Sequence, residues 1–224
     1  MTKKIAVFLN DFALKPVFKG VFWGLLLICA NAWANDAKAK HLLVFGDSLS
    51  AAYGMDWELG WAQLLDQHWQ NAEGEVVHRV SNASISGETS VGGLDRLPLT
   101  LEELNPDVVL LELGANDGLR GYPISRIREN LLKMVDLVEA SGADVIIAGI
   151  SLPPSYGPRY IDQFRAMFRD VAESRELPFI DFFREDFIGK PGYIQADGLH
   201  PTEITQPIIR DALLSFFAEE GLFQ

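Results

Sequence analysis

Short apolar runs recur along the chain, and the gaps between them are long enough to hold a helix. The runs are rich in β-branched residues and apolar at consecutive positions, so both faces of each would be buried. That pattern is typical of parallel strands in a sheet covered by helices. The expected strands span residues 42–45, 76–80, 108–113 and 145–150, with a weaker one at 178–182.

Between these runs, apolar residues recur at the three- and four-residue spacing of a helix face. Three such stripes comprise Ile127, Leu131, Met134, Val135 and Val138; Ile161, Phe164, Phe168 and Val171; and Ile208, Ala212, Leu213, Phe216 and Phe217. Alternating strands and helices predict an α/β fold, a three-layer sandwich around a doubly wound parallel sheet. In such folds the active site lies beyond the carboxyl ends of the strands.

The first 34 residues follow a different pattern. A lysine-containing start precedes an apolar run, Val21–Ala30, that is too short to span a bilayer. Ala32–Ala34 then supplies a small-x-small cleavage site, so we expect residues 1–34 to be a signal peptide and residues 35–224 the exported domain. Lipidation of Cys29 is disfavoured, because Ile28 stands where a small residue is needed.

The charge of the chain limits its partners. Its formal net charge of −12 would become −15 without residues 1–34, which contain four lysines and one aspartate. We therefore expect no binding to nucleic acid or to anionic membranes, although the acids would equally serve as a solvated face. Cys29 is the only cysteine, so the exported domain would be stabilised by its core alone. It contains no other segment suited to a membrane span.

A serine follows the first expected strand, in the run Gly46–Ser50 (GDSLS). Gly46 permits a tight turn at the strand end, and Ser48 would begin a short helix with its own N–H facing outward. Strand ends of this kind expose nucleophiles, but a helix-capping serine fits the run equally well. The run lacks the second glycine of the G-x-S-x-G nucleophile elbow.

A second candidate, His200, precedes the last helical stripe in the run Asp197–Pro201 (DGLHP). The D-x-x-H spacing lets Asp197 orient the imidazole and leaves the other ring nitrogen free as a base. The alternatives are a surface histidine beside a capping aspartate, and a metal site. A metal needs three or four ligands, and none of the other histidines (His41, His68, His78) has ligand spacing to His200.

Two further loops follow the second and third expected strands. Gly87 offers a backbone N–H that nothing blocks, and Asn116 offers a side-chain amide that can donate to a developing oxyanion. A plain loop glycine and an ordinary Asn-Asp turn are the simpler explanations. Taken together and in order, the nucleophile, two donors, acid and base are a complete set for acyl transfer.

These residues resemble those of the GDSL-type SGNH hydrolases, and especially the bacterial exported thioesterase, lysophospholipase and arylesterase group. The matching stretches are FGDSLSAAYG (45–54), NASISGETS (82–90), LELGANDGLRG (111–121), LPPSYGPRY (152–160) and DGLHP (197–201). By this resemblance Ser48 is the nucleophile, His200 the base and Asp197 the triad acid. The N–H groups of Ser48 and Gly87 and the amide of Asn116 would form the oxyanion hole.

The resemblance also implies a flavodoxin-like sheet of five parallel strands, no metal, no cofactor, and activity on acyl esters and thioesters. We expect a monomer, periplasmic or secreted, whose substrates are small acyl esters, thioesters or lysophospholipids. The acyl groove is expected among five loop residues, Leu119, Tyr122, Leu152, Pro153 and Tyr156.

Three other functions compete with this one. The first is a carbohydrate O-acetylesterase on the same scaffold, which the LPPSYG segment disfavours. The second is a non-catalytic lipid- or glycan-binding domain, which the intact set of site residues disfavours. The third is a nucleotide-binding domain, and the sequence contains no G-x-G-x-x-G or Walker pattern to support it.

Overall fold

Five parallel strands form one twisted sheet in the order β2-β1-β3-β4-β5. The computed structural model describes residues 38–72, 77–183 and 190–224, so the expected signal peptide, residues 1–34, lies outside the described residues. The strands are β1 (His41–Gly46), β2 (Arg79–Asn82), β3 (Val108–Glu112), β4 (Asp144–Ile150) and β5 (Phe179–Phe183). The predicted doubly wound sheet of five parallel strands is confirmed.

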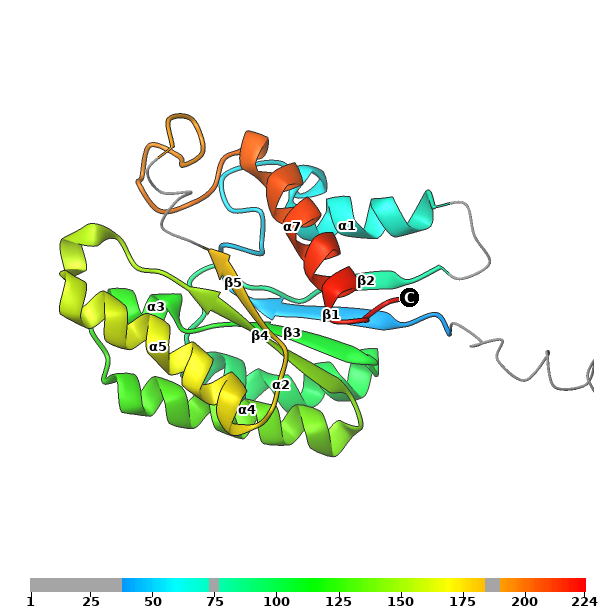
Figure 1. Ribbon diagram of the computed structural model, residues 1–224, viewed down its shortest axis with the longest axis horizontal. Coiled ribbons are helices and arrows are strands. Elements are labelled where there is room, and N and C mark those ends of the chain that lie inside the picture. The colour runs from blue at the N-terminus through cyan, green and yellow to red at the C-terminus, as the bar shows by residue number, and fades with distance from the viewer. Residues whose placement is uncertain (1–37, 73–76, 184–189) are drawn as a thin grey trace, which may run out of the picture. The chain divides into compact units, whose positions relative to one another are not determined.

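Helices cover both faces of this sheet, as Figure 1 shows: α1 and α7 lie over one face, and α2, α4 and α5 over the other. The α-helices are α1 (Trp61–Gln70), α2 (Ser90–Leu104), α3 (Ala115–Leu119), α4 (Ile124–Ser141), α5 (Pro158–Ser174) and α7 (Gln206–Glu219). Short 3₁₀ turns are η2 (Trp57–Leu59), η3 (Pro154–Tyr156) and η4 (Glu203–Thr205). The fold is therefore the predicted three-layer sandwich.

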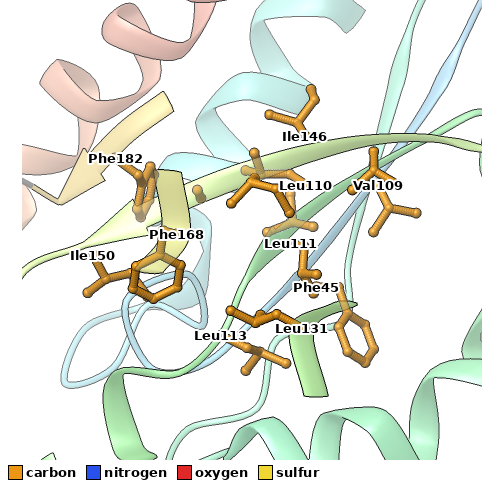
Figure 2. Close-up of a cluster of buried hydrophobic side chains, with 14 of the residues drawn as sticks. Phe45, Val109, Leu110, Leu111, Leu113, Leu131, Ile146, Ile150, Phe168 and Phe182 are labelled. Carbon is orange, nitrogen blue, oxygen red and sulfur yellow. The ribbon is translucent and has the colours of Figure 1, made fainter. Parts of the chain in front are cut away.

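The core lies between the sheet and its helices. Figure 2 shows it around β3 and β4, where Leu110 and Ile146 sit side by side on paired strands. The predicted stripes of α4 and α5 are buried throughout. Burying apolar surface of this kind contributes about 25 cal/mol for each Å² removed from water, which makes the core the main source of stability.

The predicted stripe of α7 is confirmed at Leu213 and Phe217 and wrong at its start, where Ile209 is buried in place of Ile208. Ile209, Leu213 and Phe217 face the core, whereas Ile208 is 36% exposed and Ala212 is also exposed. Because Ile208 and Ile209 are adjacent and equally apolar, the spacing of apolar residues does not show which of them faces the core. The packing of α7 against α1 determines that Ile209 does.

The second strand also begins later than predicted. The apolar run suggested 76–80, but pairing with β1 starts at Arg79 and continues through the polar Ser81 and Asn82. Val77 is 40% exposed, and Val76 lies outside the described residues. Because β2 is an edge strand, its pairing with β1 determines where it begins and ends. One contact of this pairing is between Ser81 Oγ and His41 Nε2, which lie 2.8 Å apart.

The strand order creates one topological switch point. The chain passes from β1 to β2 on one side and then to β3 on the other, so the loops after β1 and β3 diverge. A crevice forms at the carboxyl edge of a sheet where this happens. Ser48 follows β1 and Asn116 follows β3, so the topology itself places them at that crevice.

Candidate active site

The turn after β1 is built around Asp47. Its carbonyl accepts hydrogen bonds from the N–H groups of Ser50 (3.3 Å) and Ala51 (3.0 Å), and its Oδ1 accepts the N–H of Leu49 (3.1 Å). Residues 48–54 form a series of turns, so the short helix expected to begin at Ser48 is not present as such. The capping side chain is that of Asp47, which leaves the Ser48 hydroxyl free for another partner.

Gly46 is required by a close approach. A Cβ at this position would lie 2.4 Å from Oε2 of Glu112, a buried side chain at the end of the neighbouring strand β3. Glycine therefore lets a carboxyl group fit beneath the turn. Any side chain at position 46 would displace either the carboxyl group or the strand end.

The loop before η4 brings the expected base and acid to Ser48. His200 Nε2 lies 2.8 Å from Ser48 Oγ, and His200 Nδ1 lies 2.6 Å from Oδ2 of Asp197. The other carboxyl oxygen, Oδ1, accepts the N–H groups of Leu199 (2.9 Å) and His200 (3.1 Å). Serine, imidazole and carboxylate therefore form one hydrogen-bonded row.

The charge state of Asp197 follows from these contacts. Burial favours the neutral acid, but hydrogen bonds from the His200 ring and from the N–H groups of Leu199 and His200 outweigh it. They hold the pKa of Asp197 below its ordinary value. An ionised Asp197 accepts the Nδ1 proton, which leaves Nε2 unprotonated and facing Ser48. The imidazole is thus set up to accept the serine proton.

Two residues that the sequence did not single out hold this loop in place. Gln195 donates from Nε2 to the carbonyls of Tyr53 (2.8 Å) and Pro201 (3.0 Å), and its N–H donates to the carbonyl of His200 (2.8 Å). The Tyr53 ring packs against the His200 ring, with centroids 4.2 Å apart. Tyr53 lies within the matched motif, but neither residue type signals such a contact on its own.

The two expected donor loops face the same cleft. Gly87 is the third residue of a β-turn closed by the Glu88 N–H and the Ile85 carbonyl (3.1 Å), and its φ of +82° is the value that glycine readily adopts. Asn116 donates from Nδ2 to Oδ2 of Asp47 at 3.0 Å. Gly87, Asn116 and Ser48 all line the cleft.

The cleft has a volume of about 230 Å³, and part of its lining is apolar. Three of the five expected groove residues line it: Leu119, Leu152 and Pro153. Tyr122 and Tyr156 are not among its lining residues. The Tyr156 hydroxyl instead donates to the Leu119 carbonyl at 2.9 Å, so it supports the wall from behind.

Two buried carboxyl groups, Asp47 and Glu112, lie beneath the nucleophile turn. Burial raises the pKa of Asp47 to about 7, despite hydrogen bonds from Leu49 and Asn116 that favour its charged form. Burial, and after it the charge of Asp47, raise the pKa of Glu112 well above its ordinary value. Burial therefore favours the neutral, protonated form of Glu112.

Replacing Glu112 by glutamine is expected to stabilise the protein at alkaline pH. The folded wild type keeps a proton on Glu112 that the unfolded chain releases above its ordinary pKa of 4.5, so stability falls as pH rises. That loss grows by about 1.4 kcal/mol for each pH unit, and the Gln variant avoids it. Urea unfolding at pH 5 and pH 8 should show a gain for Glu112→Gln that is larger at pH 8. An equal gain at both would contradict the assignment.

Within the described part of the chain, no group of three or more His, Cys, Asp or Glu side chains is arranged to hold a metal ion. Nor does any helix there combine the length and the apolar character that crossing a membrane requires.

A doubly wound sheet that holds a Ser–His–Asp row at its switch point, beside two potential oxyanion donors, defines the chain as a serine hydrolase of the α/β class. Residues 44–206 match the model of the GDSL-like lipase/acylhydrolase family. The chain belongs to this family, and the resemblance found in the sequence is confirmed.

Named relatives share most of their length with this chain. It is 47% identical to "Esterase TesA" of Pseudomonas aeruginosa, over 77% of this chain and 85% of the relative. It is 45% identical to "Arylesterase" of Vibrio mimicus, over 88% and 94%. It is 42% identical to "Thioesterase 1/protease 1/lysophospholipase L1" of Escherichia coli K12, over 78% and 82%.

Solved structures agree with the fold. The crystal structure of TesA is 43% identical, with a TM-score of 0.76, and the match covers 80% of this chain and 99% of that one. The psychrotrophic esterase EstA from Pseudoalteromonas sp., solved with monoethylphosphonate as inhibitor, is 41% identical, with a TM-score of 0.75 and coverage of 80% and 97%.

Proposed function

We propose that this enzyme hydrolyses acyl esters and thioesters through an acyl-enzyme on Ser48. One observation carries the proposal: Ser48 Oγ lies 2.8 Å from His200 Nε2, while Asp197 holds the opposite ring nitrogen at 2.6 Å. That geometry activates a hydroxyl that is otherwise a weak nucleophile.

The reaction has two steps. In the first, His200 takes the Ser48 proton as Oγ attacks the acyl carbonyl, and it then protonates the departing alcohol or thiol. In the second, His200 takes a proton from water as the water oxygen attacks the acyl-enzyme. His200 then returns that proton to Ser48 Oγ as the bond from Oγ to the acyl carbon breaks, which releases the carboxylic acid and restores free Ser48. Asp197 stabilises the imidazolium that forms in both steps and does not itself become protonated.

Each tetrahedral intermediate carries a negative oxygen. We assign its stabilisation to the N–H groups of Ser48 and Gly87 and to the side-chain amide of Asn116, which border the same cleft. Losing one such donor costs about 3–4 kcal/mol of transition-state stabilisation.

The substrate class follows from the cleft wall. Leu119, Ile150 and Leu152 form an apolar surface beside Ser48, which suits an acyl chain better than a sugar ring. We therefore favour acyl esters, thioesters and lysophospholipids over acetylated carbohydrates. The printed names of the relatives, which include esterase, arylesterase, thioesterase and lysophospholipase, support this range.

The place of action bears on the substrate. We infer that residues 1–34 direct export and that the monomeric domain works in the periplasm or outside the cell. There it would meet lysophospholipids and neutral esters, whereas its acidic charge does not attract polyanionic acyl-CoA at long range. Thioesterase activity would then be seen in vitro and would not be the main activity in place. The same acidic charge would repel nucleic acid, so we propose no nucleic-acid partner.

A chain-length profile tests the substrate assignment. Turnover of p-nitrophenyl esters from C2 to about C12 should be measured beside hydrolysis of a lysophospholipid by the same preparation. We expect activity on medium and long chains and on the lysophospholipid. Activity confined to acetyl esters, with acetylated sugars as better substrates, would favour the carbohydrate O-acetylesterase instead.

Leu119→Asn is expected to lower kcat/KM for long-chain esters more than for acetyl esters. Leu119 is half-buried in the cleft wall, so a polar side chain there removes apolar contact with the distal methylenes of the chain. Each buried methylene contributes about 0.8 kcal/mol, so a loss of about 10-fold or more is expected for long chains. Leu99→Asn, at a position 60% exposed on α2, is the control. Equal losses for both chain lengths would argue against the groove.

A further inference from the structure

The hydrogen bonds of Asp47 define its charge. The side chain is fully buried, Oδ1 accepts the N–H of Leu49 at 3.1 Å, and Oδ2 accepts Nδ2 of Asn116 at 3.0 Å. Both carboxyl oxygens therefore face donors. Two donors at the two oxygens favour the ionised form over the neutral acid, because they stabilise the negative charge that burial disfavours.

Glu112 is arranged in the opposite way. Its Oε2 accepts hydrogen bonds from the Ser50 hydroxyl (2.7 Å) and from the N–H of Asp47 (3.2 Å). Its Oε1 is buried and has no hydrogen-bond partner among the described residues. That oxygen can carry a proton without opposing a donor, so the geometry suits a neutral carboxylic acid.

In the described part of the chain, neither Asp47 nor Glu112 has a cation among its hydrogen-bond or ion-pair partners. The nearby charged groups are engaged elsewhere: Asp117 of α3 binds the N–H and hydroxyl of Ser90, and Arg96 of α2 lies over the Phe45 ring and pairs with Glu88. On the loop before η4, His200 faces Asp197 and Ser48. A second buried negative charge here would be uncompensated.

We propose that Asp47 is ionised and Glu112 is protonated, so that the pair carries one negative charge. The charge on Asp47 fixes the Asn116 side chain with its amide nitrogen toward the oxyanion. One N–H of the amide binds Asp47, so the other remains for the substrate. If the amide were flipped, its carbonyl oxygen would face the Asp47 carboxylate and the oxyanion of the intermediate, and both would repel it. Asp47 is thus a positioning residue, and this role rests on the proposed function of Asn116.

A double-mutant cycle in the full-length enzyme tests this coupling. In Asp47→Asn, the new amide must turn its NH₂ toward either Leu49 or Asn116, so one donor loses its acceptor. We expect Asp47→Asn and Asn116→Ala each to lower kcat by about 100-fold or more, with a smaller change in KM. The double variant should be no slower than Asn116→Ala alone. Losses that multiply would overturn the proposal.

Glu112→Gln is the matched control, since glutamine keeps an acceptor for Ser50 and carries no charge. Its kcat at pH 8 should stay within a few-fold of wild type. The opposite ranking, with Glu112→Gln inactive and Asp47→Asn active, would place the charge on Glu112 and overturn the proposal.

Infrared spectroscopy supplies a readout that does not depend on whether Asp47→Asn folds. The carbonyl band of a protonated, buried carboxylic acid should be present in the wild type at pH 8 and absent from Glu112→Gln. A wild type without that band would refute the neutral acid. Failure of the proposed function is separate from these outcomes, because it would appear as catalysis without Ser48.

Discussion

Ser48→Ala is expected to lower kcat for ester hydrolysis by about 10⁵-fold while leaving the fold intact. The alanine variant has no oxygen to form the acyl-enzyme, so only binding and the oxyanion donors remain to accelerate attack by water. The free energy of unfolding should change by less than about 1 kcal/mol, since among the described residues the Ser48 hydroxyl bonds only to His200, at the cleft. Steady-state kinetics with p-nitrophenyl butyrate and a thermal melt measure both effects.

Ser215→Ala is the matched control for this substitution. Its hydroxyl donates to the Asp211 carbonyl on the exposed side of α7, and it lies on no wall of the cleft. Its activity should equal that of the wild type. Wild-type turnover in Ser48→Ala would remove the nucleophile assignment outright.

Asp197→Asn is expected to lower kcat by about 10⁴-fold with the geometry of the loop preserved. The asparagine NH₂ can donate to His200 Nδ1, which would move the ring proton to Nε2 and turn it toward Ser48. His200 could then no longer accept the serine proton. The backbone donors of Leu199 and His200 would still find the amide oxygen, so the loop keeps its shape. Kinetics at pH 8 measure the loss of kcat, and the melting temperature checks that the folded structure is preserved.

Asp211→Asn provides the control here, because Asp211 pairs with Arg210 on the exposed side of α7. We expect its kcat to match the wild type. If Asp197→Asn lost less than about 10-fold, the carboxylate would not be setting the tautomer of His200, and the base would have to be oriented by other contacts such as the Tyr53 ring.

Much of the fold was predictable because buried parallel strands and amphipathic helices leave strong periodic patterns. The strands β1, β3, β4 and β5 appear within a residue or so of their expected limits. The failures occur where periodicity is ambiguous. Ile208 and Ile209 are equally apolar, and only packing against α1 selects between them. The edge strand β2 takes its limits from register with β1 rather than from its own composition.

The site residues carried local signals, since each expected residue stands in a short motif at a strand end or before the last helix. The supporting residues did not. Gln195 reaches Tyr53 across 142 positions, and Glu112 reaches Ser50 across 62. A glutamine or a buried glutamate has no distinctive local pattern, so its role emerges only when the chain folds. The need for glycine at position 46 also becomes clear only in the folded chain, because the side chain that leaves no room for a Cβ there is that of Glu112 on β3.

The supporting residues contact the nucleophile turn and its neighbouring loops from two sides. On one side, Gln195 and Tyr53 hold the loop that contains Asp197 and His200. On the other, Asp47 links the turn to Asn116, and Glu112 fills the space beneath it. Because these contacts join loops after β1, β3 and β5, the sheet acts as the rigid frame on which the catalytic distances depend.

Reaction with a fluorophosphonate probe followed by peptide mass spectrometry tests the central assignment most directly. Ser48 Oγ should attack phosphorus and expel fluoride, leaving one phosphonate ester on the peptide that contains residues 45–54. Labelling should abolish esterase activity in proportion to its extent, and Ser48→Ala should take up no label. Modification of a different residue, or full esterase activity in a protein labelled completely at Ser48, would contradict the account.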